Sequence, residues 1–414
     1  MNNRSGFGAT VRRIGCAIVA LAVGATIAGC GSQTSGTATA GEIDVRTLDV
    51  GKYPTDPLDL RYTYENGMLD GRKLAVMRLA DHVASGPQLD SRFAYGTGAI
   101  PILTADDAIR LLADVNGPVV TRNGMMFGFA AGTTDQKPTE EGKAPPNSSF
   151  TTVVVLQFPD EQAASRAAAE IAETDFAVAA DRNQRVELPK FPQAHTHWRP
   201  TVATIGSTIA RGNYVVNLYL GLPSPDGKAL ADLAEQIYAV QLPLLDALPP
   251  LNREGILRMP YDPDAMLLRT LNPEGTGAPD FQDQAAFTDR GFLHQVGPQQ
   301  WWRSALTDTG VDRVSVSRHH GPGSVAVVYR ARDDAAANQL RDKLFENSYT
   351  APADAPRTVP NARCGEEKSS TSWKTKRYRC AVSYRRHAAT VTADQLADVH
   401  QRAAAQYALL ANSR

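Results

Sequence analysis

Two stretches of the chain, far apart in the sequence, repeat one pattern of apolar and polar positions. Residues 151–173 begin with a β-branched run, pass through Asp160 and continue as an Ala-rich segment. Residues 324–345 repeat this order, with Asp333 in the acidic position. The β-branched runs predict strands. The segments after them predict helices, because an acidic residue at a helix start accepts hydrogen bonds from free N–H groups and favours the helix dipole.

The repeat extends on both sides of these stretches. The further pairs are two strand-like segments and one helix-like segment: residues 124–129 with 313–317, 213–219 with 377–384, and 228–248 with 393–411. A Gly-Thr-Gly-Ala sequence also occurs twice, at residues 96–99 and 275–278, and is expected to form turns. The pattern predicts a duplicated α+β body. Each half would run α-β-β-α-β-β-α, as an antiparallel sheet with helices packed on one face. Chance similarity between two α+β stretches is the alternative.

The junction between the halves is expected where proline interrupts the pattern. Pro249, Pro250 and Asn252 follow the last predicted helix of the first half. The expected domains are therefore residues 42–250 and residues 253–414, and the chain is long enough for two domains of ordinary size.

The N-terminal region has a different pattern. Three arginines without an acidic residue precede an apolar run at residues 14–27. This run is shorter than the ~20 residues that a membrane-spanning helix needs, so it is typical of a signal peptide. It ends in Ile-Ala-Gly followed by Cys30, which is the lipobox arrangement. We expect residues 1–29 to be removed and Cys30 to carry acyl chains such as palmitate. An ordinary secretory signal, with Cys30 incidental, is the alternative.

A short polar segment follows the expected lipidation site. The acylated cysteine and residues up to 41 contain no charge and no large apolar side chain, so they are expected to form a flexible tether with a reach of roughly 18 Å. No later segment is apolar enough to span a membrane. The expected location is therefore the extracytoplasmic face of the cell membrane, with the lipid as the anchor.

Charge and cysteine content narrow the picture further. Without the three signal arginines, the 43 Lys and Arg become 40, against 44 Asp and Glu, a net charge of −4. This does not indicate a nucleic-acid partner. Cys364 and Cys380 remain after Cys16 is cleaved off and Cys30 is acylated, and they are expected to form a disulfide. A two-cysteine zinc site is the alternative, although no histidine lies beside the pair at zinc-finger spacing.

The chain resembles an uncharacterised cell-envelope lipoprotein family of mycobacteria and related actinobacteria. The resemblance rests on the lipobox, the polar tether, the paired strand–Asp–helix units and two segments, Gly-Arg-Lys-Leu-Ala-Val-Met-Arg-Leu-Ala-Asp at 71–81 and Gly-Phe-Ala-Ala-Gly at 128–132. It covers nearly the whole mature chain and supplies no catalytic residue. It implies a place in the cell envelope and a two-part fold.

Signatures of catalysis and of cofactor binding are missing from the sequence. There is no Gly-x-Ser-x-Gly, Ser-x-x-Lys, His-Glu-x-x-His or Walker sequence, so no catalytic residue, cofactor or metal is predicted. His195 and His197 could supply two metal ligands from one strand face, but flanking prolines favour a packing role in a loop. His319 and His320 are expected at a hairpin turn. Trp301-Trp302 is expected to pack in the core or between the domains.

One segment of the second half is strongly basic, with a local charge of +6 between residues 363 and 386. The residues considered for binding an anionic polymer, headgroup or acidic protein are Lys374, Lys376, Arg377, Arg379, Arg385 and Arg386. The alternative is an exposed edge hairpin whose cations discourage aggregation.

The sequence therefore predicts a lipoprotein of the cell envelope that binds a ligand or protein partner, with the cleft between the two halves as the expected site. A hydrolase or transferase acting on cell-wall material through paired carboxylates is one alternative, since such pairs leave little trace in a sequence. A structural or sensory module, similar in kind to extracellular sensor modules of actinobacterial kinases, is another. It predicts no cavity.

Overall fold

The computed structural model describes residues 43–57, 66–273, 277–318, 324–346, 351–367 and 376–413. Cys30, the tether, Lys374, His319 and His320 lie outside these ranges. Asp44–Arg414 belong to one structural unit. Within the described ranges, no helix has the length and apolar character needed to cross a membrane.

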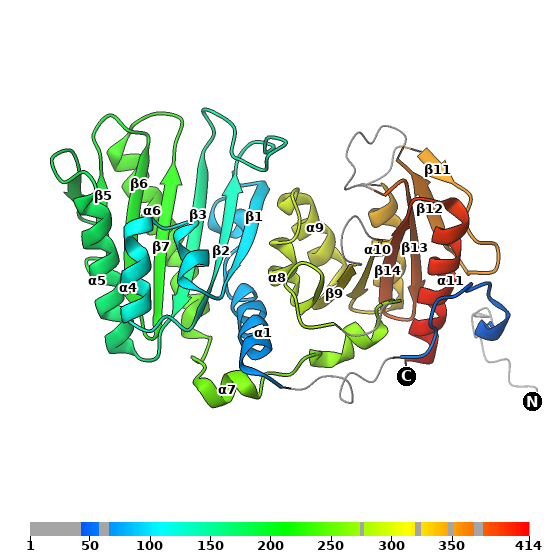
Figure 1. The fold of residues 1–414 in the computed structure, drawn as a ribbon. Helices are drawn as coiled ribbons and strands as arrows, with labels where there is room; N and C mark the ends of the chain where they lie inside the picture. Colours follow the sequence, from blue (N-terminus) through cyan, green and yellow to red (C-terminus); the bar gives the residue numbers. More distant parts are fainter. Residues whose placement is uncertain are drawn as a thin grey trace, which may run out of the picture. The chain divides into compact units, whose positions relative to one another are not determined.

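The first half is built around a seven-stranded sheet whose neighbouring strands are all antiparallel (Figure 1). Its order is β1-β2-β3-β7-β6-β5-β4. The strands are β1 (Tyr95–Ile102), β2 (Phe127–Thr134), β3 (Phe150–Gln157), β4 (Gln184–Val186), β5 (His195–Trp198), β6 (Thr204–Arg211) and β7 (Tyr214–Gly221).

The second half repeats this topology strand by strand. Its order, β8-β9-β10-β14-β13-β12-β11, gives every strand of the first sheet one counterpart. The strands are β8 (Gln284–Phe287), β9 (Arg313–Arg318), β10 (Val325–Arg330), β11 (Ala351–Ala353), β12 (Arg363–Glu366), β13 (Tyr378–Tyr384) and β14 (His387–Ala393). The predicted duplicated α+β body is confirmed.

Several details differ from the expected arrangement. Each sheet has seven strands, because strands toward its edges add to the predicted set. Strand β7 corresponds to β14, whereas the sequence comparison had paired it with β13, the strand before. The first Gly-Thr-Gly-Ala sequence lies in β1, where the register shifts between Gly96 and Gly98, and does not form a turn. Glycine at position 98 suits this irregularity because its φ of 128° is one that other residues rarely adopt.

The helices of the first half are α1 (Met68–Ala80), α2 (Gly86–Leu89), α3 (Ala105–Ile109), α4 (Gly117–Arg122), α5 (Glu161–Ala177) and α6 (Gly227–Asp246). Those that follow are α7 (Arg253–Leu257), α8 (Asp289–Leu293), α9 (Gln299–Thr309), α10 (Asp334–Glu346) and α11 (Leu396–Asn412). Short 3-10 turns are η1 (Val45–Thr47), η3 (Asp114–Asn116), η4 (Pro263–Ala265) and η5 (Leu267–Arg269). The predicted acidic caps are present, as Asp160 and Asp333 accept hydrogen bonds from Ala163 N and Ala336 N.

The helices cover both faces of each sheet, where the sequence had predicted one (Figure 1). In β3, Val153 and Val155 pack in one core with α1 and α6, while Val154 and Leu156 pack in a second core with α4 and α5. The apolar run of β3 is continuous and not alternating, which is the pattern of a strand buried on both faces. In the second sheet, β13 contacts α10 through Ser383 and α11 through Tyr384, which point to opposite faces.

Candidate functional site

A cavity of about 590 Å³ opens on the face of the first sheet that α5 covers. We call it the sheet cavity. Residues of β5, β6 and β7, the C-terminal end of α5 and the loop after α3 line it. Its polar lining residues are Asp175, Asn183, His197, Arg199, Thr204, Asn217 and Tyr219. Its volume lies within the range of small-molecule sites, and its mixed lining is typical of them.

A glycine makes room for an imidazole in this cavity. His197 of β5 is paired with Gly206 of β6, and a Cβ at position 206 would lie only 3.1 Å from Cε1 of the His197 ring. The ring is held from the other side by the edge of Phe176 in α5, with 6.2 Å between the ring centroids. Arg185 stacks on Phe176 at 4.4 Å and forms an ion pair with Glu173. These contacts fix the position of the His197 ring.

The protonation of His197 is shifted toward the neutral form. Burial lowers the pKa of the imidazole, and the positive charges of Arg185 and Arg199 lower it further. A neutral imidazole offers one hydrogen-bond donor and one acceptor. Neither nitrogen of His197 is hydrogen-bonded to any residue that the structure describes, so both are available to a ligand.

Arg199 carries a permanent positive charge into the lining. It follows β5 directly, and Nε1 of Trp198 fixes this loop by donating to the carbonyl oxygen of Val202 at 2.7 Å. The Nε atom of Arg199 is fully buried, and no described residue accepts a hydrogen bond from it. A buried donor without an acceptor costs about 1–3 kcal/mol. The guanidinium that carries this donor lines the cavity, where its charge would attract an anion.

The cavity also contains one carboxyl group, that of Asp175 near the end of α5. Burial raises its pKa, while the hydrogen bond donated by Asn116 Nδ2 at 2.6 Å lowers it. The buried Asn116 is itself held by the hydroxyl of Thr174, which donates to its Oδ1. Asp175 is therefore a fixed acceptor in the lining of the cavity, suited to a hydroxyl or amino group.

On the corresponding face of the second sheet, two arginines are paired with residues that the structure describes. There Arg341 of α10 is buried and donates to Asn338 Oδ1 and to Ser383 Oγ. Arg363 forms an ion pair with Asp342 at 3.2 Å and stacks on Phe345. The two copies of the fold have thus diverged, because polar groups that satisfy each other in one copy remain available in the other.

Comparison with known proteins places the chain in a family. A model described as the N-terminal part of a domain of unknown function, DUF7373, matches residues 62–261, and its C-terminal counterpart matches residues 266–413. The chain belongs to the DUF7373 family. No curated protein matches it. The matching solved structures include the extracellular domain of PknH from Mycobacterium tuberculosis, which is 10% identical. That match covers 40% of this chain and 94% of the other, with a TM-score of 0.29.

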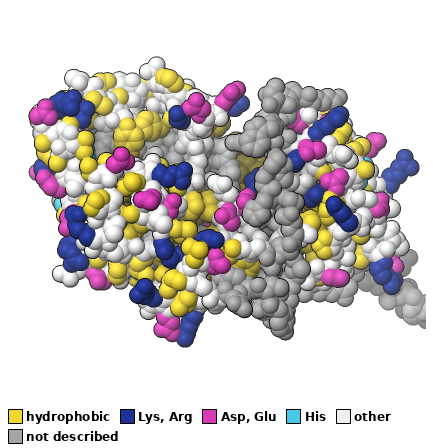
Figure 2. All heavy atoms as spheres, viewed as in Figure 1, with side chains coloured by type: hydrophobic (Ala, Val, Ile, Leu, Met, Phe, Trp, Pro, Cys, Tyr) yellow, Lys and Arg dark blue, Asp and Glu magenta, His cyan; other side chains and the backbone are white. Residues whose placement is uncertain are grey.

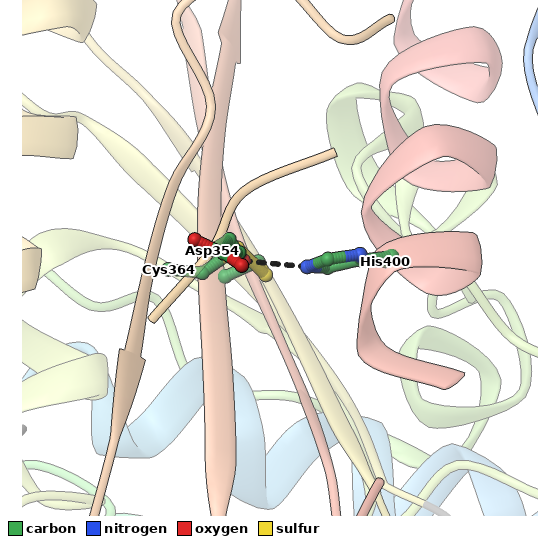
Figure 3. Close-up of a disulfide and its surroundings, with 4 residues drawn as sticks. Asp354, Cys364 and His400 are labelled. Atoms are coloured by element: carbon green, nitrogen blue, oxygen red, sulfur yellow. Dashed lines mark hydrogen bonds between the residues drawn. A yellow bond between two sulfur atoms is a disulfide. The ribbon is translucent and has the colours of Figure 1, made fainter. Parts of the chain in front are cut away.

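The disulfide of this DUF7373 chain forms as predicted. Cys364 of β12 and Cys380 of β13 face each other directly and are bonded, with 4.1 Å between their Cα atoms (Figure 3). His400 of α11 lies beside them and donates from Nε2 to the carbonyl oxygen of Asp354 at 2.5 Å. The sequence did not indicate this histidine, because it comes 20 residues after Cys380. Zinc needs thiolates, which a disulfide does not offer, so the zinc alternative is not supported.

The first half has a hydrogen-bonded pair where the second has the disulfide. Thr196 of β5 and Ser207 of β6 lie opposite each other, and their hydroxyl oxygens are 2.6 Å apart. Tyr238 of α6 donates to Ser207 from the helix side, as α11 approaches the disulfide in the second half. In both halves of the DUF7373 chain, side chains that face each other therefore join the same two strands, by a hydrogen bond in the first half and by a disulfide in the second.

Within the described residues, two cations of the predicted basic segment are paired with acidic side chains. Lys376 is paired with Asp394 at 2.5 Å, and Arg377 is paired with Glu366 at 2.6 Å. The hairpin is not at an edge, because β13 lies between β12 and β14. Arg385 and Arg386 form its two-residue turn. On the face seen in Figure 2, basic and acidic side chains are intermixed.

Two other sequence predictions had different outcomes. His195 and His197 lie in strand β5, not in a loop, and only His197 lines the sheet cavity. Trp302 is buried and stacks on Tyr329 within the core, as predicted. The residues missed were Asp175, Arg199 and their neighbours. The lining comes from separate segments, namely β5, β6, β7, the end of α5 and the loop after α3, and no local motif marks them.

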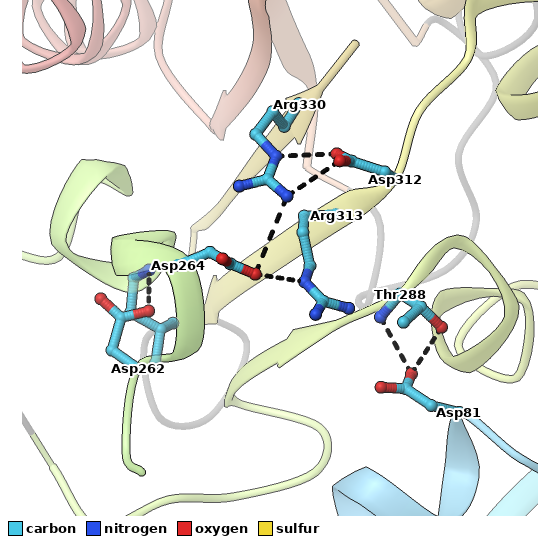
Figure 4. A network of polar contacts seen from close by, with 8 residues as sticks. Asp81, Asp262, Asp264, Thr288, Asp312, Arg313 and Arg330 are labelled. Atoms are coloured by element: carbon cyan, nitrogen blue, oxygen red, sulfur yellow. Dashed lines mark hydrogen bonds and ion pairs between the residues drawn. The ribbon is translucent and has the colours of Figure 1, made fainter. Parts of the chain in front are cut away.

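The place where a cleft between the halves was expected is filled by packed side chains. One apolar core runs through both halves, and the Phe129 ring of β2 packs on Phe281 and on His294. Asp81 accepts hydrogen bonds from the backbone N–H and the hydroxyl of Thr288, the N-cap of α8, at 2.9 and 2.8 Å (Figure 4). Gly86 N donates to Oε1 of Gln299. The sheet cavity lies elsewhere, within the first half, and a second cavity lies at α7.

Two buried ionisable groups of this interface have shifted pKa values. Burial raises the pKa of Asp81 to about 6, although the hydrogen bonds from Thr288 and the charge of Arg313 act against it. Burial lowers the pKa of His294 to about 4, although the bond from its Nε2 to the carbonyl oxygen of Val83 acts against it. Arg313 is itself paired with Asp264, next to the Arg330–Asp312 pair (Figure 4).

Proposed function

We propose that this chain is a lipid-anchored protein of the cell envelope of mycobacteria or related actinobacteria, and that it binds a small anionic ligand in the sheet cavity. The observation that carries the binding proposal is the Arg199 guanidinium, which lines the cavity together with His197. Neither side chain forms a hydrogen bond or ion pair with a residue that the structure describes, and the Nε atom of Arg199 is buried without an acceptor among them. The sequence features that support the anchor are the signal peptide, the lipobox cysteine Cys30 and the polar tether.

The lining indicates which ligand chemistry fits. Arg199 favours a carboxylate or phosphate group. Asp175, in the same lining, favours a hydroxyl or amino group. Val178 and Tyr219 line the cavity and are 62% and 47% exposed, so they offer an apolar contact at its mouth. We infer a small anion with a hydrogen-bond donor and an apolar part.

Binding is favoured over the two alternatives by features of the same cavity. A hydrolase with paired carboxylates needs two acidic residues about 5–10 Å apart. Asp175 is the one acidic residue in the lining of the sheet cavity. A purely structural or sensory module was expected to lack a cavity, whereas this cavity has a volume of about 590 Å³.

Replacing Arg199 with glutamine is expected to weaken the binding of an aromatic phosphate. With 4-nitrophenyl phosphate as the probe, calorimetric titration should show a loss of roughly 10- to 100-fold in affinity, the range for one hydrogen bond to a charged group. Arg166→Gln removes an exposed arginine from the outer side of α5 and should leave the affinity unchanged. Equal affinity in the wild type and Arg199→Gln would contradict the proposed site.

The same titration tests the catalytic alternative. Binding without release of 4-nitrophenolate is the expected result. Release that disappears in Asp175→Asn would instead identify the cavity as a catalytic centre and overturn the binding proposal.

A further inference from the structure

A second cavity, of about 500 Å³, lies where α1 and α7 meet the loop before β2. Its lining includes Met68 and Arg72 of α1, Met125 and Met126, and Arg253 and Ile256 of α7. We call it the methionine cavity. It shares no lining residue with the sheet cavity.

The apolar part of this lining is unusual for a surface that faces water. Three of the seven methionines of the chain meet here, and all three are partly exposed. Leu69 and Leu257, the neighbours of Met68 and Ile256 in sequence, are 59% and 40% exposed. Methionine side chains are flexible and adapt to an irregular apolar guest. Exposed apolar clusters of this kind mark binding sites.

The charged part of the lining is basic. Arg72 lies one helical turn after Met68, so both point to the same side of α1. Its Nε atom is buried and donates to no described residue. Arg253 is exposed and forms no ion pair with the residues that the structure describes. No acidic residue belongs to the lining.

The two helices that line this cavity, α1 and α7, are in close backbone contact. A Cβ at Gly71 would lie 2.3 Å from the carbonyl oxygen of Ile256, so α1 and α7 approach each other as closely as the backbone allows. The positions of Arg72 and Ile256 relative to each other are therefore set by backbone packing and not by side-chain contacts alone.

We propose that the methionine cavity binds a single-chain amphiphile with an anionic head group. The three methionines and Ile256 contact the acyl chain, and Arg72 with Arg253 binds the carboxylate or phosphate head. The proposed ligand accounts for both unusual features of the lining, its apolar part and its two arginines, which form no ion pair with a residue that the structure describes. The site does not depend on the ligand proposed for the sheet cavity.

Binding of dodecanoate to the purified mature chain, measured by calorimetry below its micelle concentration, tests this proposal. We expect one site for dodecanoate or dodecyl phosphate, at least tenfold weaker binding of dodecyltrimethylammonium, and no detectable binding of acetate. The comparison of carboxylate with phosphate heads distinguishes fatty acid from phospholipid-type ligands. Equal binding of the cationic amphiphile would overturn the proposal, because the chain alone would then account for the affinity.

Matched variants locate the site. Arg72→Gln is expected to weaken dodecanoate binding at least tenfold, whereas Arg258→Gln, which removes an exposed arginine just after α7, should not change it. Arg199→Gln should also leave it unchanged, which separates this site from the sheet cavity. Should Arg72→Gln fail to fold, Arg253→Gln replaces it, and a soluble folded Arg253→Gln protein with wild-type affinity contradicts the assignment.

Discussion

Replacing Cys30 with alanine is expected to move the protein from the membrane fraction to the soluble fraction of an envelope preparation. The acyl chains on Cys30 are the proposed anchor, and each buried methylene contributes ~0.8 kcal/mol, so two or three chains hold a protein on a membrane essentially permanently. No helix in the described ranges offers a second way of spanning the membrane. Ultracentrifugation followed by immunoblotting measures the distribution.

Cys16→Ala is the matched control, because it removes a cysteine from the apolar run of the same signal peptide. It should stay in the membrane fraction. The released Cys30→Ala protein should unfold at the wild-type temperature, since the disulfide uses Cys364 and Cys380. A Cys30→Ala protein that still sediments with membranes refutes lipid anchoring at this residue.

Replacing His294 with phenylalanine is expected to make the protein less sensitive to acid. The folded-state pKa of His294 is lowered to about 4, so only the unfolded chain takes up its proton as the pH falls below 6.5. The stability contributed by neutral His294 is present above pH 6.5 and is lost as the pH falls toward 4. Between pH 7 and pH 5 the variant should gain roughly 2 kcal/mol in unfolding free energy relative to the wild type. Urea unfolding at each pH measures this.

Asp81→Asn is the matched variant with the opposite sign. The folded-state pKa of Asp81 is raised to about 6, so the folded chain binds its proton before the unfolded chain does. Acidification from pH 7 to pH 5 therefore stabilises the wild type at this residue, and the variant should lose roughly 1.4 kcal/mol relative to it. The charge of nearby Asp289 raises the pKa of Asp81, and the charge of Arg290 lowers the pKa of His294. Parallel pH profiles for both variants and the wild type would contradict the prediction, because they would show that neither pKa is shifted in the folded protein.

The opposite pKa shifts of Asp81 and His294 should make the stability of the wild-type protein less dependent on pH. Asp81 and His294 lie in the same interface between the halves and titrate in overlapping ranges with opposite effects on stability. The wild-type unfolding free energy should therefore change little between pH 7 and pH 5 at this interface. In each single variant, the unfolding free energy should change with pH as the remaining group dictates.

Much of the fold follows from local patterns in the sequence. Asp160 and Asp333 cap the helices that they were predicted to cap, because a helix N-terminus needs an acceptor within a few residues along the chain. The duplication was visible for the same reason, since strand, acidic residue and Ala-rich helix recur as one local unit. The disulfide pair could be predicted by elimination among four cysteines.

Other features depended on contacts between distant segments. The edge strands β4 and β11 have three residues each, too few to show a periodic pattern. Packing of helices on both faces of β3 could have been inferred from its unbroken apolar run, but the sequence does not say which helix covers which face. The interface of the halves could not be predicted from local patterns, because its contacts join residues far apart, such as Asp81 and Thr288, which are 207 residues apart.

The sequence by itself determined the α+β class, the duplication, the disulfide and the expected lipid attachment, because each depends on residues close together in the chain or on a count of residue types. Only the tertiary structure decided the two candidate ligand sites. No sequence motif marks His197, Arg199 or Asp175. They form a candidate site because a glycine in β6 leaves space for a ring from β5, and because the fold places in the same lining an arginine that forms no ion pair with a residue that the structure describes.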